Sequence, residues 1–390
     1  MKILQNNSSK LFSKLKIRGI NLPNRIVLSP LCMYSAKDGH PNEWHFSHLS
    51  TFARARVGLI FTEATAVQKI GRITPHCLGI WKDSQIKSFK PIVQFISQMG
   101  SIPAIQLAHA GRKASTSSPW EGGQPIKQST KYLNKWNIVG PSSLPLSKTW
   151  PKPKAMNKKD INKIIIDIKK AAQRSIKAGF KVIEIHAAHG YLLHSFLSPI
   201  SNNRTDEYGG DLKRRSKLLI EVVQTVRKAI PKSIPIFCRI SAIDGKENGW
   251  KIDDSLYLSK KLKQVGVDVI DCSSGGIIGA PRFRVNDNDK PLKSDIERGL
   301  GFQVPFAEEI KKSIGIKTMA VGVIINPFQA EKILKSGQAD LIALGRELMY
   351  NPFWPLHAAQ ELNTDDNYRL WPDQYRWAVN RRASIYKTIK

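Results

Sequence analysis

Eight short apolar segments recur along the chain, and amphipathic stretches with helical periodicity separate them. Each segment has the length of a strand and is rich in β-branched residues, which is typical of strands buried in a parallel sheet. The segments are residues 26–30, 59–64, 102–109, 182–189, 236–242, 269–275, 318–322 and 341–346. In the clearest helical stretch, Ile161, Ile164 and Ile168 share one face, and Gly179 is expected to end the helix. This alternation predicts an α/β fold with parallel strands.

Two α/β architectures fit eight alternating strands and helices: a closed (β/α)₈ barrel, or TIM barrel, and an open doubly wound sheet. Polar residues follow the carboxyl ends of most segments, and only a closed barrel would bring them all to one face. We therefore expect a barrel whose mouth collects Gln106, His109, His186, His189, Arg239, Ser273, Ser274 and Arg346. Residues 110–155 and 276–300 are rich in turn-forming or charged residues, which predicts long loops over that face.

The chain length is compatible with one large barrel, since barrels exceed the usual domain size as single units. We expect residues 1–362 of the 390 to form that barrel. The remaining tail, residues 363–390, contains the motif WPDQYRW. So many aromatic residues predict that the tail docks, and we place it at a subunit interface.

The chain is strongly basic, with 61 Lys and Arg against 31 Asp and Glu and a formal net charge of +30. Such a charge raises nucleic acid or an anionic membrane surface as a partner. The lysines are scattered over most of the expected helices, so compositional drift is the better interpretation and neither partner is expected. No apolar run suits a secretory signal or a membrane span, and the four cysteines lack zinc, iron–sulfur or disulfide spacing. These features favour a cytoplasmic protein.

His186 and His189 lie three residues apart where the fourth segment ends, and Tyr191 follows. A lone histidine is more often a core residue, but a pair at a barrel mouth favours a functional site. Neutral imidazole N–H groups can polarise a carbonyl oxygen, and a tyrosine hydroxyl can deliver a proton. A metal site is the competing interpretation, and it would need a carboxylate such as Glu184. We expect no metal.

Gly322 follows the seventh segment, and Gly345 and Arg346 follow the eighth. Barrels commonly bind phosphate at this place through backbone N–H groups and a cationic side chain. The spacing therefore predicts a phosphate site.

Arg239 lies in the carboxyl-terminal part of the fifth segment, and a cation inside a barrel mouth needs an anionic or polarised partner. A salt bridge to Glu63 or Glu184 is the structural interpretation, and a bound anion or polarised ligand is the functional one. Cys32 and Tyr34 leave the first segment on the same face. From composition alone, Cys32 is equally compatible with core packing.

Several motifs resemble those of the Old Yellow Enzyme family of flavoproteins: LPNRIVLSPLCMYS, TEATAV, IQLAHAGRK, IEIHAAHGYLLHSFLSPISNNRTDEYGG, CRISA, IDCSSG and ALGREL. The resemblance runs from about Lys10 to about Leu362. Cys32 with Tyr34 and the closing QY resemble the thermophilic-like (class III) branch. The resemblance implies an FMN-bearing (β/α)₈ barrel that acts as an ene-reductase. Such an enzyme takes hydride from NADPH or NADH and passes it to the C=C bond of an enone with ping-pong kinetics.

The resemblance also implies roles for individual residues. Noncovalent FMN would contact Ser29, Pro30, Leu31, Cys32, Ala64, Gln106, Arg239, Gly345 and Arg346, with Ser274 and Gly322 near its phosphate side. His186 and His189 would hold the substrate carbonyl oxygen, and Tyr191 would protonate Cα. Tyr34 would orient the substrate. The expected partners are small enones and further copies of the chain, in a dimer or tetramer.

Two departures from the family pattern bear on these expectations. The helix after DEYGG lacks the usual serine, so Asp211 is expected to be its N-cap. In the branch, an arginine near the chain end enters a neighbouring subunit's site, and either Arg376 or Trp377 could take that place here. The alternative functions are a basic nucleic-acid-binding barrel and an FMN-dependent tRNA-modifying enzyme, although the latter does not use an HAAHGY pair.

Overall fold

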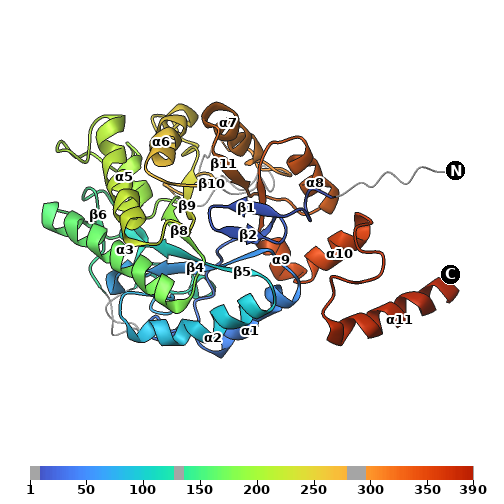
Figure 1. Cartoon of the computed structure of the whole chain (residues 1–390). Coiled ribbons are helices and arrows are strands. Elements are labelled where there is room, and N and C mark those ends of the chain that lie inside the picture. The colour runs from blue at the N-terminus through green and yellow to red at the C-terminus, as the bar shows by residue number, and fades with distance from the viewer. Residues whose placement is uncertain (1–8, 127–135, 279–295, 390) are drawn as a thin grey trace.

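Eight parallel strands close into a barrel in the computed structural model, which describes residues 9–126, 136–278 and 296–389 (Figure 1). They follow one another around the barrel in chain order, and the last pairs with the first. The strands are β3 (Ile26–Leu28), β4 (Leu59–Ala66), β5 (Ile102–Ala108), β8 (Val182–Ala187), β9 (Ile236–Ser241), β10 (Val269–Ser273), β11 (Lys317–Ala320) and β12 (Leu341–Leu344). Each expected segment contributes one strand, so the predicted barrel is confirmed and the open sheet is wrong.

Helices cover the outside of the barrel (Figure 1). The longer ones are α1 (Glu43–Arg54), α2 (Ser84–Gln98), α3 (Lys158–Ala178), α5 (Leu212–Ala229), α6 (Ile252–Gln264), α7 (Val304–Ile314) and α8 (Pro327–Lys335). Helix α3 is the one expected from its isoleucine spacing, and Ile161, Ile164 and Ile168 are buried. Asn157 caps its start by accepting from the backbone N of Asp160, and Gly179 ends it with a left-handed φ of 103°.

Two apolar layers stabilise the barrel. The outer layer lies between strands and helices, and there the rings of Phe89 and Phe180 meet edge to face with centroids 5.5 Å apart. The inner layer fills the barrel with side chains such as Phe61, Phe237 and Met319. A hairpin of β1 (Leu15–Ile17) and β2 (Ile20–Leu22) packs onto the inner layer from the amino ends of the strands. The barrel is therefore a packed core whose other end carries the mouth.

Long connections lie above the mouth, as expected. Between β5 and α3 the chain forms short 3₁₀ turns and the two-residue strands β6 (Val139–Gly140) and β7 (Lys154–Ala155). Most of the predicted loop 276–300 lies outside the described residues. The expected cap of α5 is confirmed, because Oδ1 of Asp211 accepts from the backbone N of Arg214 at 2.8 Å.

The tail begins against the chain's own surface, after α9 (Arg346–Tyr350) and α10 (Trp354–Glu361). Trp371 stacks on Phe353 with ring centroids 5.9 Å apart, and Arg54 donates to the Tyr375 hydroxyl at 2.6 Å. Helix α11 (Asp373–Ile389) then runs clear of the barrel (Figure 1), and Trp377 is 62% exposed. Two of the aromatic anchors therefore dock locally, while most of α11 is exposed.

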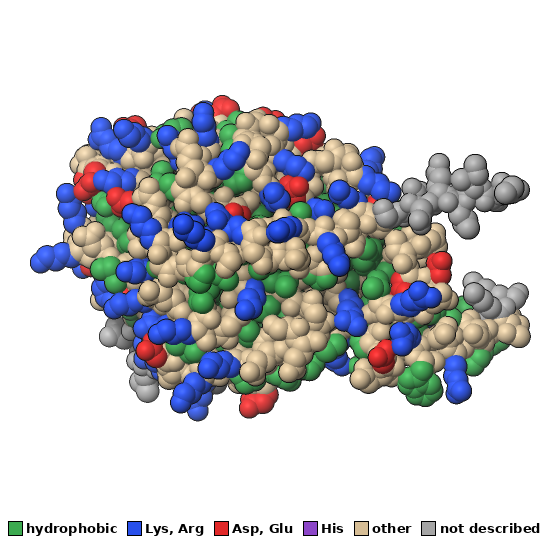
Figure 2. Space-filling view, viewed as in Figure 1, with side chains coloured by type: hydrophobic (Ala, Val, Ile, Leu, Met, Phe, Trp, Pro, Cys, Tyr) green, Lys and Arg blue, Asp and Glu red, His purple; other side chains and the backbone are tan. Residues whose placement is uncertain are grey.

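Lys and Arg side chains are spread over the visible face, interspersed with other residues (Figure 2). They do not gather in one stripe of the kind that tracks a nucleic-acid backbone. Within the described ranges, no helix combines the length and apolar character needed to cross a membrane.

Candidate active site

The strand register brings the predicted polar residues together at the mouth. His186 on β8 pairs with Arg239 on β9, and Arg239 pairs with Asp271 on β10. Ser29 follows β3, and its backbone N donates to the carbonyl oxygen of Leu344 at 2.9 Å. This bond joins the first and last strands of the barrel, β3 and β12, at their carboxyl ends.

A cavity of about 510 Å³ opens at this mouth, a size that suits a cofactor. Ten of the predicted residues line it: Ser29, Pro30, Leu31, His189, Arg239, Ser273, Ser274, Gly322, Gly345 and Arg346. A larger hollow of about 1180 Å³ lies under the loop between β5 and α3, and lysines are its only titratable lining residues among those described. These predicted site residues therefore line the cavity at the barrel mouth and not the larger hollow.

The phosphate-binding prediction agrees with the cavity's charge. Arg298 and Arg346 both line it, and burial together with the nearby Arg346 cation lowers the pKa of Arg298. Two cations facing one cavity are stabilised by a bound anion. Gly322 has a left-handed φ of 118°, and a Cβ there would lie 2.8 Å from Nε2 of Gln303. The lining residues thus fit the phosphate of FMN.

Arg239 connects the cavity to a buried carboxylate. Its Nη1 donates to Oγ of Ser29 at 2.9 Å, and its Nε lies 3.2 Å from Oδ2 of Asp271. Burial raises the pKa of Asp271 to about 6, and the Arg239 cation opposes that shift. Arg239 therefore presents a fixed positive charge to the cavity.

Both salt-bridge partners expected for Arg239 are wrong. Glu63 lies 3.3 Å from Nε2 of His45, and Glu184 accepts from Nε2 of Gln106 at 2.8 Å. Asp271 takes the place instead, because it is the direct register partner of Arg239, whereas Glu184, on the strand at the other side of β9, pairs with Phe237. A carboxylate inside the apolar strand sequence VIDCS was the signal that could have identified it.

His186 and His189 face each other, with ring centroids 5.3 Å apart and planes at 87°. Burial, followed by the charge of Arg239, lowers the pKa of both imidazoles well below its usual value, so both rings are neutral near pH 7. Nδ1 of His186 accepts from the backbone N of Ala188 at 3.3 Å, which places the proton on Nε2. His189 Nε2 lies 2.7 Å from Oγ of Ser273. The pair can donate hydrogen bonds without carrying charge.

Tyr191 lies beside this pair, with its ring centroid 5.0 Å from that of His186. Burial raises the pKa of the hydroxyls of Tyr191 and Tyr34, so both are protonated at neutral pH. Burial also raises the pKa of the Cys32 thiol, which is therefore not a thiolate. The mouth thus holds the hydroxyl proton donor Tyr191 beside two neutral imidazoles, and Tyr34 interacts with Tyr191.

Some predicted residues lie apart from the cavity lining. Ala64 and Gln106 pair across β4 and β5, and the Gln106 amide binds Glu184. His109 turns into the fold, where its Nδ1 accepts from the backbone N of Gly111. Its expected place at the mouth is wrong. Within the described ranges, no three His, Cys, Asp or Glu side chains are grouped so that they could hold a metal ion.

Lys113 was not assigned a role from the sequence, although it lies in the quoted motif IQLAHAGRK. Its Nζ donates to the carbonyl oxygens of His189 at 2.6 Å and Gly276 at 2.5 Å, and it lies 5.6 Å from the centroid of the Tyr191 ring. Burial lowers the pKa of Lys113 to about 7, with a further contribution from the Arg112 cation. Lys113 is 76 residues from His189 in the sequence, so its contact with the turn after β8 exists only in the folded chain.

This arrangement places the protein among the FMN-dependent oxidoreductases built on a TIM barrel. A family model described as the NADH:flavin oxidoreductase / NADH oxidase family matches residues 10–365, and the chain belongs to this family. The predicted resemblance is thereby confirmed, together with FMN and a nicotinamide as cofactors.

Similar proteins support the same class. An NADPH dehydrogenase of Geobacillus thermodenitrificans is 44% identical over 354 residues, covering 90% of this chain and 94% of that protein. An NADH:flavin oxidoreductase of Gibberella zeae is 42% identical over 373 residues, covering 92% and 87%. These relatives are named as oxidoreductases, not as nucleic-acid-binding proteins.

Solved structures of similar fold agree. Morphinone reductase is 25% identical with a TM-score of 0.73, and the match covers 92% of this chain and 91% of that one. A 2-naphthoyl-CoA reductase, 21% identical with a TM-score of 0.79, shares the fold. This chain spans 52% of its length.

Proposed function

We propose that this enzyme is an ene-reductase that reduces the C=C bond of α,β-unsaturated carbonyl compounds in two alternating half-reactions at one site. The observation that carries the proposal is the neutral pair His186 and His189 beside the protonated Tyr191. NADPH is the favoured donor, because the Geobacillus relative is named NADPH dehydrogenase.

The histidine pair would bind the substrate's carbonyl oxygen. Two N–H donors from neutral rings stabilise negative charge that develops on that oxygen without a competing counter-ion. Tyr34, at the exit of β3, would orient the substrate from the opposite loop. Such polarisation makes the β-carbon electrophilic.

Proton delivery at Cα is assigned to Tyr191. Burial keeps its proton in place until an acceptor with carbanion character lies next to the hydroxyl. When bound, FMN supplies the hydride transfer from nicotinamide to the β-carbon. Ser29, Arg239 and Arg346 would hold it, with Arg239 placing positive charge next to its ring system.

Arg346→Ala is expected to weaken FMN binding about 10- to 100-fold, because a charge-assisted phosphate contact is lost. Lys169→Ala, at an exposed position on α3, is the matched control. Fluorescence titration of apoprotein with FMN measures both. Equal FMN affinity in Arg346→Ala and the control would show that the phosphate lies elsewhere.

The proposed activity is tested by enone-dependent oxidation of NADPH under anaerobic conditions, with the organic product identified. The saturated ketone is the expected product from cyclohexenone. Formation of an allylic alcohol, or NADPH oxidation that requires oxygen and ignores the enone, would contradict the proposal.

We also propose that α11 contacts a second copy of the chain. Trp377, Ile385 and Ile389 on this helix are 60–78% exposed, which is unusual for apolar residues that serve no interface. Arg376 pairs with Asp373 of its own helix at 2.7 Å, so Trp377 is the better candidate for the contact.

Truncation after Arg376 should therefore lower the oligomeric state while FMN stays bound, since Trp371 and Tyr375 keep their local contacts. Sedimentation velocity measures the change. Ile166→Ala, which removes an exposed apolar residue of α3, is the control. An oligomeric state that is unchanged in the truncated protein would show that α11 does not contact a second copy of the chain.

A further inference from the structure

The turn that carries the proposed catalytic residues has a disfavoured backbone. His189 adopts a left-handed φ of 60°, which is rare for a residue other than glycine, and Gly190 follows with 72°. The turn lies between β8 and α4 (Leu192–Leu197), with Tyr191 as the residue before the helix. Something outside the turn must hold this conformation, because the backbone does not favour it on its own.

One side of the turn is held by close backbone packing. A Cβ at Gly190 would lie 2.4 Å from the carbonyl oxygen of Gly276, and a Cβ at Gly276 would lie 2.5 Å from Cα of His189. Ser241 adds a link, because its Oγ accepts from the backbone N of His189 at 3.0 Å. These contacts hold the turn on the side that faces Ser241 and Gly276.

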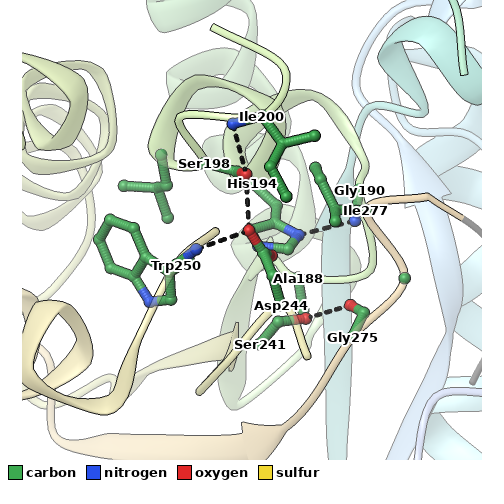
Figure 3. Close-up of polar contacts among 12 residues, drawn as sticks. Ala188, Gly190, His194, Ser198, Ile200, Ser241, Asp244, Trp250, Gly275 and Ile277 are labelled. Carbon is green, nitrogen blue, oxygen red and sulfur yellow. Dashed lines mark hydrogen bonds and ion pairs between the residues drawn. The ribbon is translucent and has the colours of Figure 1, made fainter. Parts of the chain in front are cut away.

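The other side is held by His194, which projects from α4 toward the turn (Figure 3). The backbone N of Gly190 donates to its Nδ1 at 2.8 Å. A ring nitrogen that accepts a hydrogen bond is unprotonated, so the proton of a neutral ring is on Nε2. Nε2 lies 3.0 Å from Oδ1 of Asp244, and both side chains are completely buried.

Asp244, in the loop after β9, is fixed in turn by Ser198 at the end of α4 and by Trp250 of its own loop (Figure 3). Its Oδ2 accepts from Oγ of Ser198 at 2.6 Å and from the backbone N of Trp250 at 2.8 Å. Burial alone would raise the pKa of Asp244, but its contact with His194 and these hydrogen bonds hold the pKa below the ordinary value. The carboxylate is therefore charged, and it selects the imidazole tautomer that leaves Nδ1 as an acceptor.

We propose that His194 and Asp244 form a positioning pair that holds the Gly190 amide and, through it, the catalytic geometry of His189 and Tyr191. Both side chains are completely buried, and both ring nitrogens of His194 face protein groups, so the pair acts through the turn rather than on the substrate. The proposal rests on the proposed function, because it concerns the roles given there to His189 and Tyr191. Displacement of such groups by about 1 Å can slow a reaction about 100-fold.

The first test uses the wild-type holoenzyme with ¹⁵N-labelled histidine. NMR at pH 8 should show Nδ1 of the His194 ring unprotonated and the ring proton on Nε2, with assignment by loss of its signal in His194→Asn. A ring protonated on Nδ1 cannot accept from Gly190, and that result would overturn the proposal. This measurement does not depend on turnover.

Two variants separate the two contacts of His194. His194→Asn places an amide oxygen near the position of Nδ1 and keeps an acceptor for Gly190, whereas His194→Gln reaches Asp244 and loses that acceptor. The probe is p-hydroxybenzaldehyde, because its phenolate oxygen carries the same kind of charge that the histidine pair would stabilise on the substrate's carbonyl oxygen. Its affinity should stay within about threefold of wild type in His194→Asn and fall at least about tenfold in His194→Gln. FMN content and thermal midpoint should be similar in both. His48→Asn, on α1, is the control for replacement of a partly buried histidine.

The outcomes distinguish the two proposals. If the wild type does not reduce enones, the proposed function fails whatever the tautomer. If it does reduce them, and His194→Gln binds the phenol as tightly as wild type, the positioning role is wrong. Equal losses in both variants, with FMN released, would indicate a structural role only.

If His194→Gln does not fold, Asp244→Asn replaces it, since it keeps the shape and removes the charge that selects the tautomer. Its phenol affinity should fall at least about tenfold, and an unchanged affinity would overturn the proposal.

Discussion

Combining His186→Ala with His189→Ala is expected to slow enone reduction about 10²- to 10³-fold or more, because both donors to the substrate's carbonyl oxygen are lost. Phenol binding should weaken in parallel, since a phenolate oxygen carries the same kind of charge. Stopped-flow mixing with cyclohexenone and titration with p-hydroxybenzaldehyde, followed by its long-wavelength band, measure both effects.

The control for the histidine variant is His48→Ala, which changes a partly buried histidine of α1 that does not line the cavity. FMN content must be equal in all three proteins. Wild-type phenol affinity together with a wild-type enone rate in the double variant would remove the histidine pair from the mechanism.

Tyr191→Phe should slow the enone half-reaction about 10²- to 10⁴-fold while leaving the NADPH half-reaction nearly unchanged. Only the first of these needs a proton at Cα. Phenylalanine keeps the ring that packs against His186 with centroids 5.0 Å apart, so the pocket shape is retained. Stopped-flow measurement of each half-reaction separates the two rates.

The matched control for this variant is Tyr350→Phe, which removes a hydroxyl from an 88% exposed tyrosine at the outer edge of the cavity. Equal slowing of both half-reactions in Tyr191→Phe would indicate a binding or folding defect. The hydroxyl would then not be the proton donor.

The barrel could be predicted from the sequence because each buried strand carries its own signal. Residues 182–189 and 236–242 are rich in apolar and β-branched residues, and glycine or a turn separates each from the next helix. Closure followed from the polar residues at the strand ends. His186 and Arg239 share one register position only when the sheet is parallel and continuous, and the structure has that register.

The partners of buried charges could not be predicted in the same way. Glu63, Glu184 and Asp271 are all carboxylates within strands, and sequence alone does not show which one lies within reach of Arg239. The choice depends on strand order and on the direction of each side chain, which alternates along a strand. The register of β9 and β10 decides it in favour of Asp271.

The roles of His194 and Lys113 were also beyond sequence reasoning. Both act on one turn through contacts with its backbone, at Gly190 for His194 and at His189 for Lys113. Side-chain patterns carry no signal for hydrogen bonds to a backbone that lies 76 residues away, as for Lys113. Only the left-handed turn brings those backbone groups to the two side chains.

The central claim is tested most directly by anaerobic titration of the purified protein. Its visible spectrum should be that of bound FMN, which one equivalent of NADPH should bleach and one equivalent of cyclohexenone should restore. Protein that stays colourless after FMN is added would contradict the account at the cofactor. A spectrum that NADPH bleaches and that oxygen restores, but that the enone leaves bleached, would contradict it at the substrate.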